Sequence, residues 1–180
     1  MVTVFAPVWE IAPHEFRRAT EVTYLGMVHG TMAALRHMRP RNRGTIVQVG
    51  SALAYRGIPL QSAYCGAKHA LRGFTNSLRT ELEHGNSAIA VTIVELPAVN
   101  TPQFDWARTY MPRRPRPVPP VLQPEAVADK IFRAAFDPKR EYWLSASTFE
   151  AILGNMALPQ FLDRYLARNA YQAQKTATAV

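Results

Sequence analysis

Residues 44–82 read GTIVQVGSALAYRGIPLQSAYCGAKHALRGFTNSLRTEL. The β-branched run at 45–49, bounded by glycines, predicts a short strand that is covered on both faces. Apolar residues then recur at helical spacing over 62–84, and Gly85 follows as a C-cap, so a helix is expected there. The next apolar run, 88–96, predicts a second strand. Strand, helix and strand in this order predict a parallel crossover unit and therefore an α/β fold.

Further helices and a strand are expected around this unit. Apolar spacing over 13–38 predicts a long amphipathic helix, interrupted gently at Gly26 and Gly30. Downstream we expect a helix at 125–136, a short strand at 141–146, and helical patches over 148–171 that are broken at Gly154 and Pro159.

Composition bounds the class of protein. At 180 residues, 48% hydrophobic and 19% charged, the chain fits one globular domain with a sizeable core. No apolar run is long enough to span a membrane, and the start, MVTVFAPVWE, lacks a basic region and a cleavage signature. The single cysteine cannot form an intrachain disulfide. We therefore expect a cytoplasmic protein without a membrane partner.

The net charge of +8 gathers in two arginine-rich clusters, at 36–43 and 108–116. These clusters are either a nucleic-acid patch or solvated loops that can contact an acidic cofactor. Neither shows interleaved aromatic stacking or a known nucleic-acid motif, which favours the second interpretation, so no nucleic-acid partner is expected. The five histidines show no metal-binding spacing, and no metal is expected.

Residues 97–124 contain eight prolines and are too irregular for a strand. A loop of this length inside a compact domain is typical of a lid or binding segment, so 97–123 is interpreted as a substrate lid. Its aromatic residues Phe104, Trp106 and Tyr110 either meet a bulky apolar substrate or pack the lid onto the body.

Tyr64 and Lys68 lie four residues apart at the start of the helix expected at 62–84, and so project from one face. A phenol ionises near pH 10, and a neighbouring ammonium lowers its pKa toward the working range. By itself the pair also fits a surface tyrosine packed on a lysine stem. The position of Ser51 favours a catalytic role for the pair. Ser51 follows the first strand at the edge where open α/β sheets place their ligands, thirteen residues before Tyr64.

The whole run 44–82 resembles the short-chain dehydrogenases/reductases, in which a serine ends a strand and Tyr-x-x-x-Lys opens the next helix. Residues 15–38 resemble the preceding helix of that family, and 91–104 resemble its following strand and nicotinamide-binding turn. The resemblance implies the later half of a Rossmann-like, doubly wound parallel sheet with flanking helices. It implies a partial catalytic domain over 1–146, followed by a C-terminal helical extension over 147–180.

The resemblance also implies an oxidoreductase that transfers a hydride between NAD or NADP and an alcohol or carbonyl substrate. Tyr64 would be the general acid/base, Lys68 would lower its pKa and bind the nicotinamide ribose, and Ser51 would polarise the substrate carbonyl. A homo-oligomer and a small-molecule alcohol or ketone as substrate are expected on the same ground. Other implied contacts are Pro97, Val99 and Thr101 with the cofactor, and Leu53, Phe104, Trp106 and Tyr110 with the substrate.

Three departures from the family pattern bear on function. Thr23 stands where many members have an active-site asparagine, and the turn after the second strand reads Pro97-Ala98 rather than Pro-Gly. The family's T-G-x-x-x-G-x-G turn, which holds the pyrophosphate, is missing from the sequence, so we expect impaired dinucleotide binding. The alternative is a non-catalytic fragment or interaction module from a truncated or mis-started gene. The choice between NAD and NADP depends on the missing segment.

Overall fold

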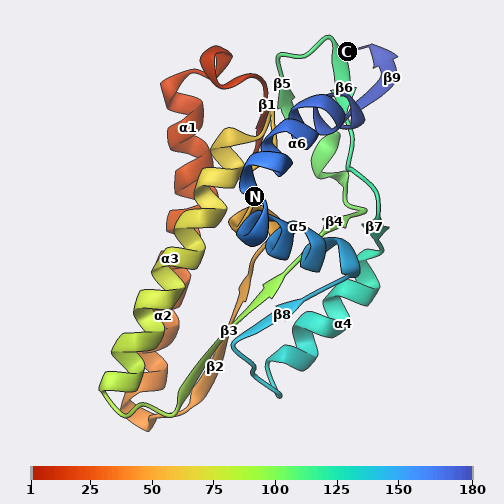
Figure 1. Ribbon diagram of the computed structural model, residues 1–180. Helices are drawn as coiled ribbons and strands as arrows, with labels where there is room; N and C mark the ends of the chain where they lie inside the picture. Colours follow the sequence, from red (N-terminus) through yellow and green to blue (C-terminus); the bar gives the residue numbers. More distant parts are fainter. Residues whose placement is uncertain (1, 180) are drawn as a thin grey trace.

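The computed structural model describes residues 2–179, and a three-stranded parallel sheet in the order β2–β3–β8 forms its centre (Figure 1). β2 (Gly44–Val49) pairs with β3 (Ile89–Glu95), and β3 pairs with β8 (Glu141–Trp143). α3 (Ser62–His84) connects β2 to β3. The predicted parallel crossover unit is therefore confirmed, and the predicted bounds of its helix agree with those observed.

The long helix expected before this unit is present in three consecutive parts. They are α1 (Pro13–Thr20), a π-helical turn (Glu21–Leu25) and α2 (Gly26–Met38). The interruption thus comes just before Gly26, and Gly30 lies inside a regular helix.

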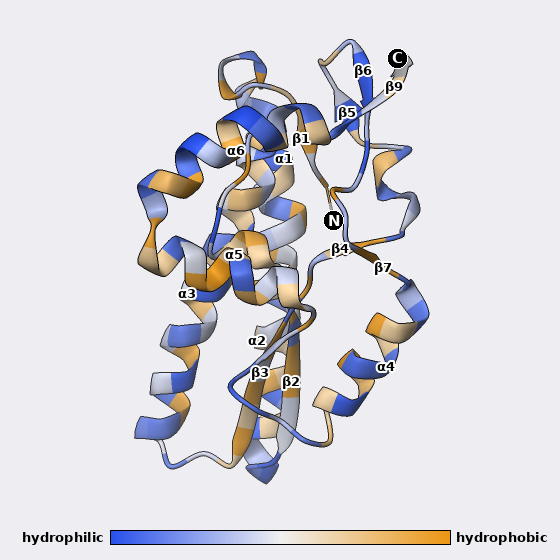
Figure 2. Ribbon diagram, turned by 45° about the vertical axis from the view of Figure 1, so that its right-hand side comes forward, coloured by the Kyte–Doolittle hydropathy of each residue, from blue (hydrophilic) through white to orange (hydrophobic). Residues whose placement is uncertain are grey.

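Helices cover both faces of the central sheet. α2 and α3 lie side by side on one face, and α4 (Pro124–Ala134) crosses the other (Figure 1). Apolar residues run along most of β3 (Figure 2), which pairs with strands on both sides. The core between the sheet and α2 and α3 contains Ile46, Leu78, Ile89 and Val91, with Ala34, Leu35, Met38, Phe74 and Leu82 packed against it.

The expectation that the strand at 45–49 is covered on both faces is wrong. Ile46 and Gln48 are buried toward α2, where the Gln48 amide donates to the Thr31 hydroxyl at 2.8 Å. Val47 is only half-buried, and Val49 is 42% exposed. The reason is that β2 lies at the edge of the described sheet, where its alternate residues have fewer neighbours.

The segment 97–123 contains short strands that the sequence does not predict. They pair with distant parts of the chain, which is why local patterning misses them. β4 (Ala98–Val99) pairs with β7 (Val121–Leu122), β5 (Arg108–Thr109) with β1 (Val4–Phe5), and β6 (Arg113–Pro115) with β9 (Lys175–Ala179).

The tail forms α5 (Ala146–Ala157) and α6 (Pro159–Ala173). The break expected at Gly154 is absent, because this glycine lies inside α5, whereas Pro159 does begin α6 as its first residue. Beyond α6, the fully buried Gln174 amide accepts from Gln61 and donates to the Pro59 carbonyl, at 2.7 and 2.9 Å. The tail thereby supports the loop that leads into α3.

Between residues 2 and 179, none of the helices is both long and apolar enough to cross a bilayer.

Candidate active site

Ser51 lies at the carboxyl end of β2, where the backbone leaves the sheet. The ladder to β3 continues past the strand, since Gly50 N–H donates to Val94 O and Ala52 N–H donates to Leu96 O. The Ser51 hydroxyl caps the 3₁₀-helix Ala52–Ala54 and accepts from the Leu53 N–H at 3.2 Å. The serine turn is thus held both by β3 and by its own side chain.

Tyr64 and Lys68 lie in the first two turns of α3 and are both buried. The Lys68 ammonium donates to the Val49 carbonyl at 2.6 Å and lies 5.8 Å from the centre of the Tyr64 ring. The Ser51 hydroxyl hydrogen-bonds with the Tyr64 side chain. The structure therefore brings the three sequence-predicted residues together at the carboxyl end of the central strands.

The pKa of Tyr64 differs in direction from the sequence expectation. Burial raises it above its ordinary value, and the hydrogen bond with Ser51 opposes that rise without cancelling it. Burial also lowers the pKa of Lys68 to about 8, against the opposing negative charge of Glu95. The structure therefore contains a neutral phenol next to an amine that changes its charge at mildly alkaline pH.

Glu95, the last residue of β3, is a part of this site that the sequence interpretation missed. It is fully buried, and its carboxylate accepts the Ser51 N–H at 2.5 Å. Burial raises its pKa to about 7 despite this hydrogen bond and the charges of Lys68 and Arg72. The available signal was an acidic residue at the end of an otherwise apolar strand, at the same sheet edge as Ser51.

The residues expected at the cofactor lie directly after β3. Pro97 and Val99 are half-buried, and Val99 is part of β4, which pairs with β7. Thr101 is exposed and precedes the 3₁₀-helix Pro102–Phe104. Since these residues follow β3 and Ser51 follows the parallel strand β2, both groups lie at the same edge of the sheet.

The residues expected at the substrate lie in two places. Leu53 is half-buried and adjoins Ser51 through its N–H, and Phe104 is half-buried in the lid segment. Trp106, which is 67% exposed, lines a cavity of about 290 Å³ between β1, α1 and the lid segment. Ser51, Tyr64 and Lys68 do not line that cavity. The Tyr110 hydroxyl contacts Glu15.

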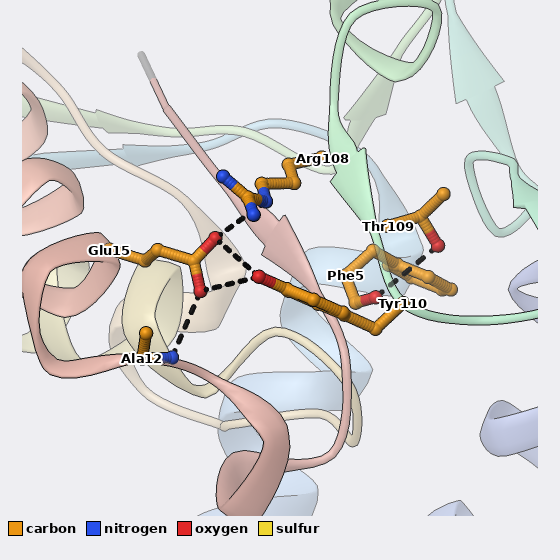
Figure 3. Close-up of polar contacts among 6 residues, drawn as sticks. All are labelled: Phe5, Ala12, Glu15, Arg108, Thr109 and Tyr110. Atoms are coloured by element: carbon orange, nitrogen blue, oxygen red, sulfur yellow. Dashed lines mark hydrogen bonds and ion pairs between the residues drawn. The ribbon is translucent and has the colours of Figure 1, made fainter.

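Glu15 and its partners tie the lid segment to the start of α1 (Figure 3). The buried carboxylate accepts hydrogen bonds from Tyr110 Oη at 3.1 Å and from Ala12 N at 2.9 Å, and it forms an ion pair with Arg108 Nε at 2.8 Å. β5 pairs with β1 beside it, and Thr109 Oγ1 donates to Phe5 O at 3.3 Å. Residues near 108–110 are thus anchored to the body of the protein. We call this set, Ala12, Glu15, Arg108 and Tyr110, the Glu15 clamp.

Thr23, which stands at the position of the family's asparagine, is buried in the π-helical turn. Its hydroxyl lies 3.4 Å from Val2 N and 3.5 Å from Val2 O. Single π-helical turns inside α-helices are frequent at functional sites. Here the turn directs a threonine hydroxyl to the segment before β1.

Within residues 2–179, no three His, Cys, Asp or Glu side chains gather in a way that could hold a metal ion.

Comparison with known proteins identifies the family. Residues 2–109 match the family model of the short chain dehydrogenases, so the chain belongs to this family. The uncharacterized oxidoreductase YxnA of Bacillus subtilis is 31% identical over 175 residues, which are 96% of this chain and 49% of YxnA. The human dehydrogenase/reductase SDR family member 7 is 51% identical over 67 residues, 37% of this chain and 20% of that protein. The chain therefore spans about half the length of YxnA.

Two solved structures share the fold. A short chain dehydrogenase from Burkholderia cenocepacia, crystallised with NADP, gives a TM-score of 0.67 at 23% identity and covers 92% of this chain and 65% of its own. A short-chain dehydrogenase from Streptomyces avermitilis gives 0.69 at 21% identity, with 97% and 70% covered. The predicted Rossmann-like α/β fold with flanking helices is confirmed.

Proposed function

We propose that this chain carries the acid–base chemistry of an NAD- or NADP-dependent oxidoreductase that interconverts an alcohol and a carbonyl compound. The observation that carries the proposal is the joint burial of Ser51, Tyr64 and Lys68 at the carboxyl end of the central parallel strands. In open α/β sheets this edge is where ligands bind.

Tyr64 is the proposed proton donor and acceptor. Because burial raises the pKa of its phenol, Tyr64 stays neutral at ordinary pH and holds a proton that it can donate to a developing alkoxide. A nearby Lys68 ammonium favours the phenolate that this transfer leaves behind. Lys68 is thus proposed to stabilise the negative charge of the Tyr64 phenolate after the proton has left.

Ser51 is the proposed donor to the substrate oxygen. Its oxygen already accepts from the Leu53 N–H, so its own hydrogen is available for Tyr64 or for a carbonyl oxygen seated between the two hydroxyls. Since β3 fixes the Ser51 backbone, the hydroxyl is oriented before the substrate arrives. Preorganised donors of this kind contribute strongly to rate.

The donors at this edge fit a nicotinamide riboside. The Lys68 ammonium and the Tyr64 hydroxyl match ribose hydroxyls, and the backbone of Pro97 and Val99 with the Thr101 hydroxyl matches an amide. When bound, the nicotinamide would supply or accept the hydride. The sequence contains no glycine-rich turn for the pyrophosphate, so we propose that this chain alone binds a dinucleotide weakly.

The proposed partner is a small-molecule alcohol or ketone, bound near Leu53 and the lid segment 97–123. Phe104 and Trp106 are proposed to contact its apolar part, and Tyr110 to position the lid through Glu15. The reducing cytoplasm, the homo-oligomer and the helical extension over 147–180 stay predictions.

The decisive experiment is Tyr64→Phe in the full-length protein that the gene encodes. Loss of NADH or NADPH absorbance is followed with a panel of aromatic and cyclic ketones, and we expect turnover to fall at least about a hundredfold. Tyr165→Phe, which alters an exposed tyrosine of α6, serves as the matched control. Near-normal turnover by Tyr64→Phe across the pH range would refute the assignment. A folded protein without any turnover or cofactor binding would favour the non-catalytic alternative.

A further inference from the structure

Glu95 occupies an unusual position for a carboxylate. Its side chain is fully buried, Oε2 accepts the Ser51 N–H at 2.5 Å, and Oε1 has no hydrogen-bond partner among residues 2–179. A carboxylate that is buried and half-partnered destabilises a fold. A glutamate in this place therefore contributes something other than stability.

The glycine that precedes Ser51 makes room for this carboxylate. A Cβ at Gly50 would overlap the carboxyl group of Glu95 and would come within 2.6 Å of the Ile93 side chain. The serine turn and the Glu95 side chain are thus fitted to each other, and the contact does not depend on a flexible surface rotamer.

The charged and titratable groups that act on Glu95 come from two elements. α3 presents Tyr64, Lys68, Arg72 and Arg79, and β8 presents Glu141. The first three follow at four-residue spacing, so they form one row on the helix face. The Nε atom of Arg72 is also buried without a hydrogen-bond partner among the described residues, and its guanidinium lies 3.8 Å from the centre of the Tyr55 ring. Glu95 is thus opposed mainly by cations of the helix that carries the catalytic pair.

We propose that Glu95 is a positioning residue for the proposed reaction: it holds the Ser51 turn through the peptide N–H, and its negative charge keeps Lys68 in the ammonium form beside Tyr64. The proposal rests on the proposed function for its role in catalysis. Its structural part, the effect of Glu95 on Ser51 and Lys68, can be measured without any turnover.

The physical argument concerns the balance at Lys68. Burial depresses the pKa of Lys68 to about 8, and Glu95 is the charge that opposes this effect. The pKa of Glu95 itself is raised to about 7, so both groups are charged only in the interval between these values. Removal of the carboxylate leaves burial unopposed, and Lys68 then loses its proton near neutral pH.

The first test uses this chain labelled with ¹³C-lysine, whose Lys68 signal is assigned by its loss in Lys68→Met. Glu95→Gln keeps the shape and an oxygen for the Ser51 N–H but removes the charge. We expect the pKa of Lys68 to fall by about one unit or more. Glu15→Gln, which changes a buried carboxylate in the Glu15 clamp, is the control and leaves Lys68 unchanged. An unchanged Lys68 pKa in Glu95→Gln would overturn the proposal.

The second test concerns the Ser51 amide, measured by hydrogen exchange. Glu95→Gln retains its protection, because a side-chain carbonyl still accepts the hydrogen bond, whereas Glu95→Ala increases its exchange at least about tenfold. Equal exchange in the wild type and in Glu95→Ala contradicts the positioning of Ser51. If Glu95→Ala does not fold, Glu95→Leu, which also lacks an acceptor for the Ser51 N–H, replaces it, and exchange equal to that of the wild type contradicts the positioning of Ser51 in the same way.

The third test separates this proposal from the proposed function. In the full-length protein, Glu95→Gln moves the alkaline limb of the kcat profile to lower pH by about one unit, following Lys68. If Tyr64→Phe is inactive but the Glu95→Gln profile does not move, the positioning role is refuted and the proposed function stands. If Tyr64→Phe remains active, the proposed function is wrong, and the catalytic role of Glu95 is refuted with it.

Discussion

Each end of the segment 95–110 involves a buried carboxylate: Glu95 is its first residue, and Glu15 of α1 is contacted by Arg108 and Tyr110 at the other end. The two carboxylates have opposite properties. Glu15 in the clamp accepts hydrogen bonds from Ala12 and Tyr110 and forms an ion pair with Arg108, whereas Glu95 behind the serine turn accepts one hydrogen bond from Ser51. Burial alone would raise the pKa of Glu15, but hydrogen bonds from Ala12 and Tyr110 and the charges of Arg108 and His14 hold it below its ordinary value. Burial prevails at Glu95, whose pKa rises to about 7.

The difference shows that burial does not determine the effect of an acid on stability. The donors that reach its two oxygens decide whether the charged form is favoured in the folded state. At the clamp the charge holds the lid segment to α1. Next to the proposed catalytic residues the same chemical group weakens the fold, as is common where a perturbed pKa serves function.

The largest effect that sharpens this contrast is expected from Glu95→Gln. Because folding raises the pKa of Glu95, its protonated carboxyl group contributes to the free energy of unfolding. This contribution is fully present below about pH 4.5 and is lost as pH rises toward 7. The wild type should therefore lose about 3 kcal/mol of unfolding free energy across this interval, and the glutamine variant should not. Urea unfolding at about pH 5 and 8 measures it. A wild type that gains stability relative to Glu95→Gln over the same range would contradict the raised pKa.

A somewhat smaller loss is expected from Gly50→Ala, which crowds the same carboxylate. The added methyl group meets the Glu95 carboxyl and the Ile93 side chain, and such overpacking costs about 2–3 kcal/mol. In a Glu95→Ala background the cost should shrink, which a double-mutant cycle of unfolding free energies detects. Full additivity of the two changes would show that Gly50 and Glu95 do not share this space.

Glu15→Gln tests the other carboxylate of the comparison, because it removes the charge that stabilises the Glu15 clamp. The loss of charge-assisted hydrogen bonds costs about 2 kcal/mol at neutral pH. Because the pKa of Glu15 is lowered, its contribution is present above about pH 4.5 and disappears as pH falls through the folded pKa. The two proteins should thus converge in stability in acid. The exposed Glu10→Gln is the control, and an equal loss at every pH would count against a charge effect.

The smallest effect is expected from Tyr110→Phe, which removes one donor of the Glu15 clamp. Tyr110 is 40% exposed, so water partly replaces the lost bond and the cost is about 1 kcal/mol. Tyr165→Phe provides the baseline. The more sensitive measurement is the pH midpoint of acid unfolding, which should move to higher pH in Tyr110→Phe. A midpoint that stays in place would mean that the Tyr110 hydrogen bond does not lower the pKa of Glu15.

Local pattern and topology together predicted the parallel crossover unit that carries the proposed catalytic residues. The stripe of apolar residues fixed the helix at 62–84, and two strands in parallel order require that their carboxyl ends meet at one edge. The sequence therefore suffices to place Ser51, Tyr64 and Lys68 near one another. Their protonation could not be predicted, because the sequence does not reveal how deeply Tyr64 is buried.

The missed features all depend on partners far away in the chain. β1 and β5 are two residues each, too short for periodicity, and pair across about a hundred residues. Glu15 carried a local signal, an acidic residue at the third position of a helix that begins after Ala12. No local signal in the sequence indicated that Glu15 contacts the lid segment. The sequence shows that Glu95 ends an apolar strand, but it does not show which donors reach it.

The position of Gln174 near the end of the chain determines when, during synthesis, the loop before α3 obtains its hydrogen-bond partner. A chain leaves the ribosome from its amino terminus, so the helix bearing Tyr64 emerges long before Gln174 has been made. Until then the Gln61 amide and the Pro59 carbonyl lack the partner that meets Gln61 across 113 residues of sequence. The nascent protein can therefore form β2 and β3 early, while the loop that leads into α3 gains its last hydrogen-bond partner only when this late residue arrives.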